Sequence, residues 1–94
     1  MRRLGDNGQE VMTIQELDSV VLTVDLPDHK LKRGDIGTVV MVHSGGAGYE
    51  VKFVTLDGRT VVVTTLLSSQ LRPIAEGEIA HARSVVEAHA LAEY

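Results

Sequence analysis

Cysteine and tryptophan are absent from this 94-residue sequence, and its only aromatic residues are Tyr49, Phe53 and Tyr94. Without cysteine the chain can form no disulfide, no thiolate nucleophile and no sulfur-ligated metal site. The shortage of aromatic rings also argues against single-stranded nucleic-acid platforms and proline-rich peptide grooves, because both rely on stacked aromatic surface. The peptide-groove role of signalling SH3 domains is therefore disfavoured.

The sequence also lacks a long hydrophobic run and an excess of positive charge. No segment approaches the roughly 20 consecutive apolar residues that a membrane span requires. No apolar run follows Arg2 and Arg3, as it would in a secretory signal, so we expect a cytoplasmic protein. The net charge of −4 argues against nucleic-acid binding, since affinity for phosphates comes from clustered Lys and Arg.

Hydrophobic periodicity divides the chain into three parts. Residues 1–12 show none and are predicted to form a flexible N-terminal tail. Residues 13–74 are predicted to form one small domain of short strands, entered through a single helical turn that the capping-box spacing of Thr13 and Glu16 indicates. Residues 75–94, where Ala, Glu and His replace β-branched residues, are predicted to form a C-terminal α-helix.

Five short segments of the central part are rich in β-branched residues or alternate between apolar and polar positions, as strands do. They are residues 18–24, 34–43, 49–55, 59–66 and 71–74. In the third segment the odd-numbered Tyr49, Val51 and Phe53 are expected to face the core. Gly37 predicts a bulge or a close backbone approach.

The connections between these segments indicate how the strands are arranged. A long exposed loop comes first, with Leu26 and Leu31 as its inward anchors. A Gly-rich hairpin follows, then an Asp57-Gly58 hairpin of type I′, and finally a short helical turn at residues 68–70. This order predicts a mainly β fold, a five-stranded SH3-like barrel to which the C-terminal helix is added. An oligonucleotide-binding barrel is the main alternative.

Residues with catalytic or metal-binding potential do not form a recognisable motif. The four histidines, His29, His43, His81 and His89, show no metal-ligand spacing such as HExxH. Ser68 and Ser69 lack the glycines of a nucleophile elbow. We therefore predict that the protein is not an enzyme and that it holds no metal or cofactor.

One basic cluster points to a different role. Lys30, Lys32 and Arg33 adjoin residues 34–39, a segment that resembles the KOW motif of SH3-like domains that contact RNA. Three acidic residues flank the cluster and oppose its charge, namely Asp25, Asp28 and Asp35. RNA contact through the three basic residues is accordingly an alternative function.

About two thirds of the sequence, without the N-terminal tail and the predicted C-terminal helix, resembles domain-of-unknown-function family 4926, a group of small bacterial proteins with no assigned activity. The resemblance is carried by residues 16–18, 20–23, 25–27, 31–40, 49–53, 57–58 and 70–73. A more distant likeness, through residues 33–39 and 49–53, is to the SH3-like domain of nitrile hydratase β subunits. That likeness implies protein partners and no metal ligand of its own.

Taken together, these features favour a protein-interaction module, either an accessory subunit or an antitoxin-like neutraliser. The glutamates Glu76, Glu78, Glu87 and Glu93 outnumber the single Arg83 after residue 74, which favours a basic partner. The predicted helix would present an apolar stripe made of Ile79, Ala82, Val86 and Ala90. Two alternatives for this stripe are that it caps its own barrel or joins two copies in a homodimer.

Overall fold

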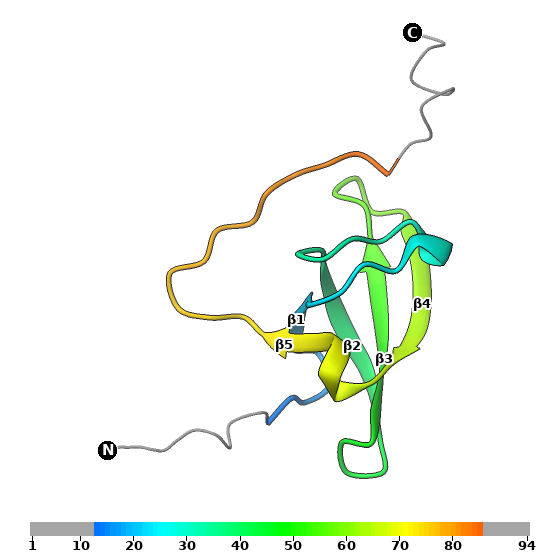
Figure 1. The fold of residues 1–94 in the computed structure, drawn as a ribbon, viewed down its shortest axis with the longest axis vertical. Coiled ribbons are helices and arrows are strands. Elements are labelled where there is room, and N and C mark those ends of the chain that lie inside the picture. The colour runs from blue at the N-terminus through cyan, green and yellow to red at the C-terminus, as the bar shows by residue number, and fades with distance from the viewer. Residues whose placement is uncertain (1–12, 86–94) are drawn as a thin grey trace, which may run out of the picture.

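The computed structural model describes residues 13–85, which form a curled antiparallel sheet (Figure 1). Its five strands are β1 (Ser19–Leu22), β2 (Ile36–His43), β3 (Gly48–Val54), β4 (Thr60–Leu66) and β5 (Leu71–Pro73). Their order in the sheet is β4-β3-β2-β1-β5. Two single 3-10 turns, η2 (Pro27–His29) and η3 (Ser68–Gln70), lie in the connections. The mainly β class, the strands and the turn at residues 68–70 are confirmed.

The predicted SH3-like barrel is wrong, because the sheet does not close. Within the described residues, β4 pairs only with β3 and β5 pairs only with β1, so each is an edge strand. Leu66 of β4 and Leu71 of β5 nevertheless belong to one buried core. The curvature thus brings side chains from both edges together while their backbones stay apart. Closure fails because β5 has only three residues and ends at Pro73, which has no N–H to donate.

The core lies on the concave side of the sheet and follows the alternation of its strands. Tyr49, Val51 and Phe53 are at most 3% exposed, which confirms the predicted inward face of β3. Leu31 is buried and Leu26 packs against the core, and the two form an isolated bridge across the first long loop. Both loop anchors are therefore confirmed.

A one-residue shift changes the inward face of β2. Val39 pairs with Val51 and Met41 pairs with Glu50, so Val40 is the extra residue of a bulge. Before the bulge Val39 is buried, and after it Val42 packs against the core while Met41 is 49% exposed. The inward-facing residues of β2 are therefore odd-numbered before Val40 and even-numbered after it.

Gly37 precedes the bulge and marks a close approach of two strands. A β-carbon at Gly37 would lie 2.6 Å from Cγ1 of Val51 and 2.8 Å from Cε1 of Phe53. The position therefore has no room for a side chain. Of the two roles predicted for this glycine, the structure confirms the close approach.

The Asp57-Gly58 hairpin is confirmed, but its type I′ turn is wrong. Such a turn needs positive φ at both central residues, and here Gly58 has φ 94° while Asp57 is not among the positive-φ residues of the described chain. The Thr55 amide donates to the Arg59 carbonyl at 2.7 Å, and the Gly58 amide donates to Thr55 at 2.9 Å. The hairpin thus has a three-residue loop whose last residue is the left-handed glycine.

The helical turn expected at Thr13 to Glu16 is also absent. Instead, the Gln15 amide donates to Oδ2 of Asp18 at 2.9 Å, and Leu17 adopts a φ of 74°. The carboxylate that accepts a backbone hydrogen bond in this turn is therefore that of Asp18, and not that of Glu16 as the capping box predicted. The tail predicted for residues 1–12 lies outside the described residues.

The predicted C-terminal helix is wrong over residues 75–85, which make a single turn at Glu76 and Gly77 and otherwise run without regular secondary structure (Figure 1). Gly77 has φ 84°, which breaks a right-handed helix in its first turn. An extended chain also advances about 3.3 Å per residue against 1.5 Å for a helix, so it can reach across the sheet. Residues 86–94 of the predicted helix lie outside the described residues.

Candidate functional site

Residues 75–85, which we call the strap, leave β5, swing away from the sheet and return toward the opposite end of the molecule (Figure 1). Its first anchor is a bidentate ion pair, in which Arg72 Nη1 and Nη2 lie 2.9 and 2.5 Å from the two carboxylate oxygens of Glu78. The Ala75 amide donates to the same carboxylate at 2.6 Å. The hydrogen bonds from Arg72 and Ala75 lower the pKa of Glu78 to about 2.

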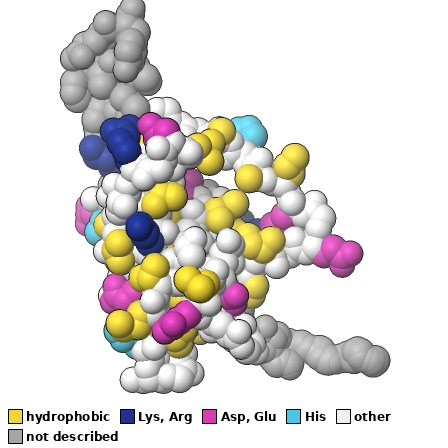
Figure 2. Space-filling view, turned by 180° about the vertical axis from the view of Figure 1, so that it is seen from behind, with side chains coloured by type: hydrophobic (Ala, Val, Ile, Leu, Met, Phe, Trp, Pro, Cys, Tyr) yellow, Lys and Arg dark blue, Asp and Glu magenta, His cyan; other side chains and the backbone are white. Residues whose placement is uncertain are grey.

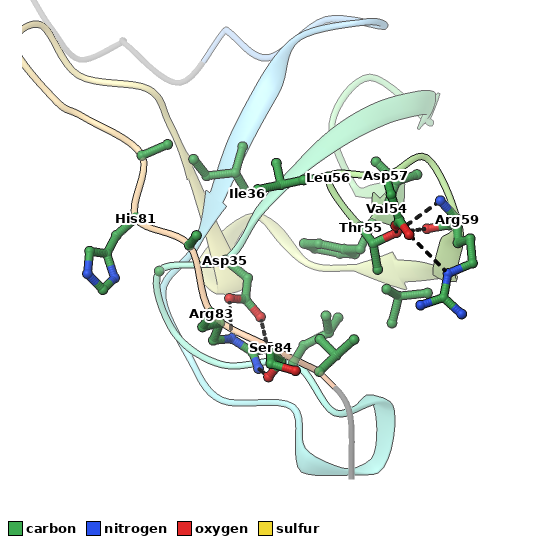
Figure 3. Close-up of a pocket in the computed structure, with 17 residues that line it drawn as sticks. Asp35, Ile36, Val54, Thr55, Leu56, Asp57, Arg59, His81, Arg83 and Ser84 are labelled. Atoms are coloured by element: carbon green, nitrogen blue, oxygen red, sulfur yellow. Dashed lines mark hydrogen bonds and ion pairs between the residues drawn. The ribbon is translucent and has the colours of Figure 1, made fainter. Parts of the chain in front are cut away.

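The second anchor lies at the far end of the strap. Arg83 Nε is 2.8 Å from Oδ1 of Asp35, and its Nη2 contacts Oδ2 (Figure 3). Nη2 also donates to the Lys30 carbonyl at 2.9 Å. Asp35 accepts a further bond of 2.8 Å from the Lys32 amide. Burial alone would raise the pKa of Asp35, but the hydrogen bonds from Arg83 and Lys32 outweigh it and the pKa is lowered.

Between the strap, the start of β2 and the β3–β4 hairpin lies a cleft of about 540 Å³, which we call the strap cleft. Its apolar lining comprises Leu31, Ile36, Phe53, Val54, Leu56 and Val61, together with Ala80, Ala82 and Val85 of the strap. A second hollow of about 450 Å³ lies between the strap and strands β1 and β5, and Ile36 borders both. In Figure 2 the strap stands away from the sheet, and hydrophobic side chains border the space between them.

Exposed apolar side chains surround the mouth of the strap cleft. Leu56, at the tip of the hairpin, is 93% exposed, and about half of the Val54 side chain and two fifths of Ile36 face solvent. Figure 3 shows Ile36 and Leu56 side by side along the cleft, with Asp57 and Arg59 beyond them. Grouped apolar side chains of this kind commonly mark interaction surfaces.

The charged groups of the strap cleft are already paired. Arg59 Nε lies 3.7 Å from Asp57 Oδ2, and Asp35 is held by Arg83. A hydrogen bond from the Thr55 hydroxyl and the charge of Arg59 lower the pKa of Asp57. The cleft therefore offers an apolar lining with little uncompensated charge, which is suited to bind apolar groups.

The structure separates the residues of the predicted apolar stripe. Ile79 borders the second hollow and is 93% exposed, and Ala82 lines the strap cleft. Because the strap is extended, the two do not share a helical face. Val86 and Ala90 lie outside the described residues.

The basic residues of the alternative RNA site lie together in the first long loop, and all three are exposed. Their backbones are held by acidic side chains, since the Arg33 amide donates to Asp25 and the Lys32 amide to Asp35, both at 2.8 Å. The predicted proximity of these carboxylates is confirmed. Lys30 has φ 61°, and its carbonyl accepts a hydrogen bond from Arg83. The loop therefore forms part of the second contact that holds the strap.

The histidines occupy separate places. His43 Nε2 lies 3.0 Å from Glu50, His29 Nε2 lies 3.4 Å from the Thr64 hydroxyl, and His81 lines both hollows beside the strap. His89 lies outside the described residues. Among residues 13–85 no group of three or more His, Asp or Glu side chains could hold a metal ion. The same residues contain no helix long and apolar enough to cross a bilayer.

Sequence reasoning missed the strap cleft and both of its anchors. The Asp35–Arg83 contact spans 48 residues, so no local pattern could indicate it. Leu56 was one available sign, because an apolar residue next to Asp57-Gly58 occupies the exposed tip of a hairpin. Arg83, the single cation between residues 75 and 94, was another residue that a charge argument could have singled out.

Comparison with known proteins identifies a family to which the chain is similar, but that family has no assigned activity. The family model described as Domain of unknown function (DUF4926) matches residues 16–73, which is more than half of the chain. No curated protein and no solved structure matches. The match covers all five strands and ends where the strap begins.

Proposed function

The chain belongs to domain-of-unknown-function family 4926, and we propose that it is a non-enzymatic protein-interaction module that holds an apolar segment of a partner protein in the strap cleft. The observation that carries this proposal is the apolar lining of the cleft with an almost fully exposed Leu56 at its mouth. Burial of one such leucine side chain stabilises a complex by about 1.5–3 kcal/mol.

The charges around the cleft indicate what kind of segment fits. Both ion pairs, Asp35 with Arg83 and Asp57 with Arg59, are made within the chain, so a charged partner would have to displace one of them. Glu78, one of the glutamates on which a basic partner was predicted, is bound to Arg72. Apolar complementarity therefore supports the proposal better than charge does.

The state of the carboxyl groups supports a binding role over catalysis. A general acid or base works best when its pKa lies near the operating pH. Asp35 and Asp57, the carboxyl groups that line the cleft, both have a lowered pKa and stay ionised near neutrality. Neither is held ready to exchange a proton there.

The experiment compares affinity purifications of three tagged forms of the full chain from native cytoplasm. Leu56→Asp places a charge at the mouth of the cleft, while Leu17→Asp makes the same change at a residue that is 80% exposed and lines neither hollow. We expect one stoichiometric protein with wild type and Leu17→Asp, and its loss with Leu56→Asp. Equal recovery with all three forms would contradict the proposal.

The RNA alternative gives a different result in the same experiment. RNA contact predicts an eluate with a high ratio of absorbance at 260 to 280 nm that ribonuclease abolishes. It also predicts steep salt dependence and loss of binding when Lys30, Lys32 and Arg33 are replaced by glutamine. Leu56→Asp would then leave binding unchanged.

A further inference from the structure

The outer edge of β4 is an unprotected sheet edge. β4 pairs with β3 along one side, and among residues 13–85 no other backbone hydrogen bond reaches it. In an edge strand, alternate residues direct their N–H and C=O groups away from the sheet, where they can pair with another strand. β4 has seven residues, and its edge is regular from Val62 to Leu66, because Val61 is the extra residue of a bulge.

The sequence of β4 carries none of the residues that normally blunt an edge. It reads TVVVTTL and contains no charged residue, no proline and no glycine. Natural edge strands commonly use lysine, proline, a bulge or very short length to prevent association. The register irregularity opposite Phe53 and Val54 affects only the start of β4, and the pairing from Val62 to Leu66 is regular.

The other edge of the same sheet is protected in several ways. β5 has three residues, ends in Pro73 and is followed at once by the strap. Arg72 on this edge is tied to Glu78. The contrast within one sheet shows that only the β4 edge is fit to accept another strand.

We propose that β4 pairs antiparallel with β4 of a second copy of this chain, joining two sheets into one. Two identical strands paired in this way are related by a two-fold axis, so the contact closes on itself. Because β4 is uncharged, two copies that each carry a net charge of −4 can meet there without like charges facing each other. The blunted β5 edges limit the assembly to a dimer.

In the register centred on Val63, the three cross-strand pairs nearest the two-fold axis are all β-branched. Val63 then faces Val63 of the second copy and Val62 faces Thr64 on either side, all within the regular part of β4. Such pairs stabilise a ladder by roughly 0.2–1 kcal/mol each. Val63 is 48% exposed in one copy, so pairing covers apolar surface that is otherwise in water.

Sedimentation velocity of the full chain tests the dimer. Val63→Lys sets two like charges opposite each other at the two-fold axis, and Val40→Lys makes the same change at a residue of similar exposure, 41%, on the central strand β2. We expect wild type and Val40→Lys to sediment as dimers and Val63→Lys as a monomer. A monomeric wild type, or a dimeric Val63→Lys, overturns the proposal.

Amide hydrogen exchange of the wild-type chain gives a second test that does not depend on a variant. We expect the outward-facing β4 amides to exchange about tenfold or more slowly at concentrations where the dimer forms than after dilution. Rapid exchange at every concentration overturns the proposal. Protection that is independent of concentration also overturns it, since a segment of the same chain would then cover the edge.

Discussion

Arg83 binds Asp35 from 48 residues away, with Nε 2.8 Å from Oδ1 and a second contact between Nη2 and Oδ2. Both side chains are largely shielded from solvent, and Asp35 is also fixed by the Lys32 amide. The pair therefore joins the end of the strap to the loop that precedes β2. Both residues also line the strap cleft, so their contact forms part of its wall.

Replacing Arg83 should release the far end of the strap. A partly exposed ion pair contributes about 1 kcal/mol or less, so Arg83→Gln should increase the rate of cleavage after Glu76 by a glutamate-specific protease about fivefold. Arg59→Gln is the matched control, because its ion pair with Asp57 is exposed and includes no residue of the strap. Equal cleavage of both variants would show that the Arg83 contact does not hold the strap.

The first anchor should open in acid. The pKa of Glu78 is about 2 in the folded chain against an ordinary value of 4.5. Its contribution is therefore complete above about pH 4.5 and is lost as the pH falls toward 2, because protonation favours the released strap. The Ala75 amide shift and the Glu78 carboxyl carbon, followed by NMR, should titrate together in this range. Titration of Glu78 near 4.5 would contradict the ion pair.

Gly37→Ala should destabilise the sheet. The added β-carbon would lie 2.6 Å from Cγ1 of the buried Val51, so the core must shift, at a cost of about 1–3 kcal/mol. Gly48→Ala is the control, because its β-carbon would meet Leu66 O at an ordinary 3.6 Å. Urea unfolding should show a lower free energy for Gly37→Ala and little change for Gly48→Ala. The reverse order would refute the close approach.

Thr65→Val should raise the pKa of Glu50 toward its ordinary value. The Thr65 hydroxyl bond is the main cause that lowers this pKa, and the bond from His43 is the next. A carbon-detected NMR titration measures the change, with Thr64→Val as a control that leaves Glu50 untouched. Because the folded pKa of Glu50 is depressed, the Thr65→Val chain should lose less stability on acidification. An unchanged pKa would show that the hydroxyl bond is not formed.

The strands were predictable because their pattern is local. β-branched residues and strict alternation, clearest from Tyr49 to Phe53, record which side of a strand is buried. The closure of the sheet was not predictable in this way, because it depends on whether β4 and β5 meet. Pro73 and the shortness of β5 decide that question, and their effect is seen only once the partner of β5 is known.

The strap and its cleft were hidden for a similar reason. Helix propensity over residues 75–85 is a weak local preference, and it yields to Gly77 and to the contact between Arg83 and Asp35. The apolar residues of the cleft come from three separate parts of the chain. No single stretch of sequence contains them. Of the two predicted partner-binding residues that lie within residues 13–85, Ala82 lines the strap cleft and Ile79 does not.

The bulge at Val40 has a consequence for comparing sequences within the family. In a regular strand an insertion or deletion of one residue reverses every side chain beyond it, so only changes in steps of two preserve the buried face. In β2 the bulge at Val40 accommodates one extra residue, so Val39 before it and Val42 after it both face the core. A relative that lacks it should show a single-residue gap at this point, with both flanking apolar patterns intact and aligned on either side of the gap.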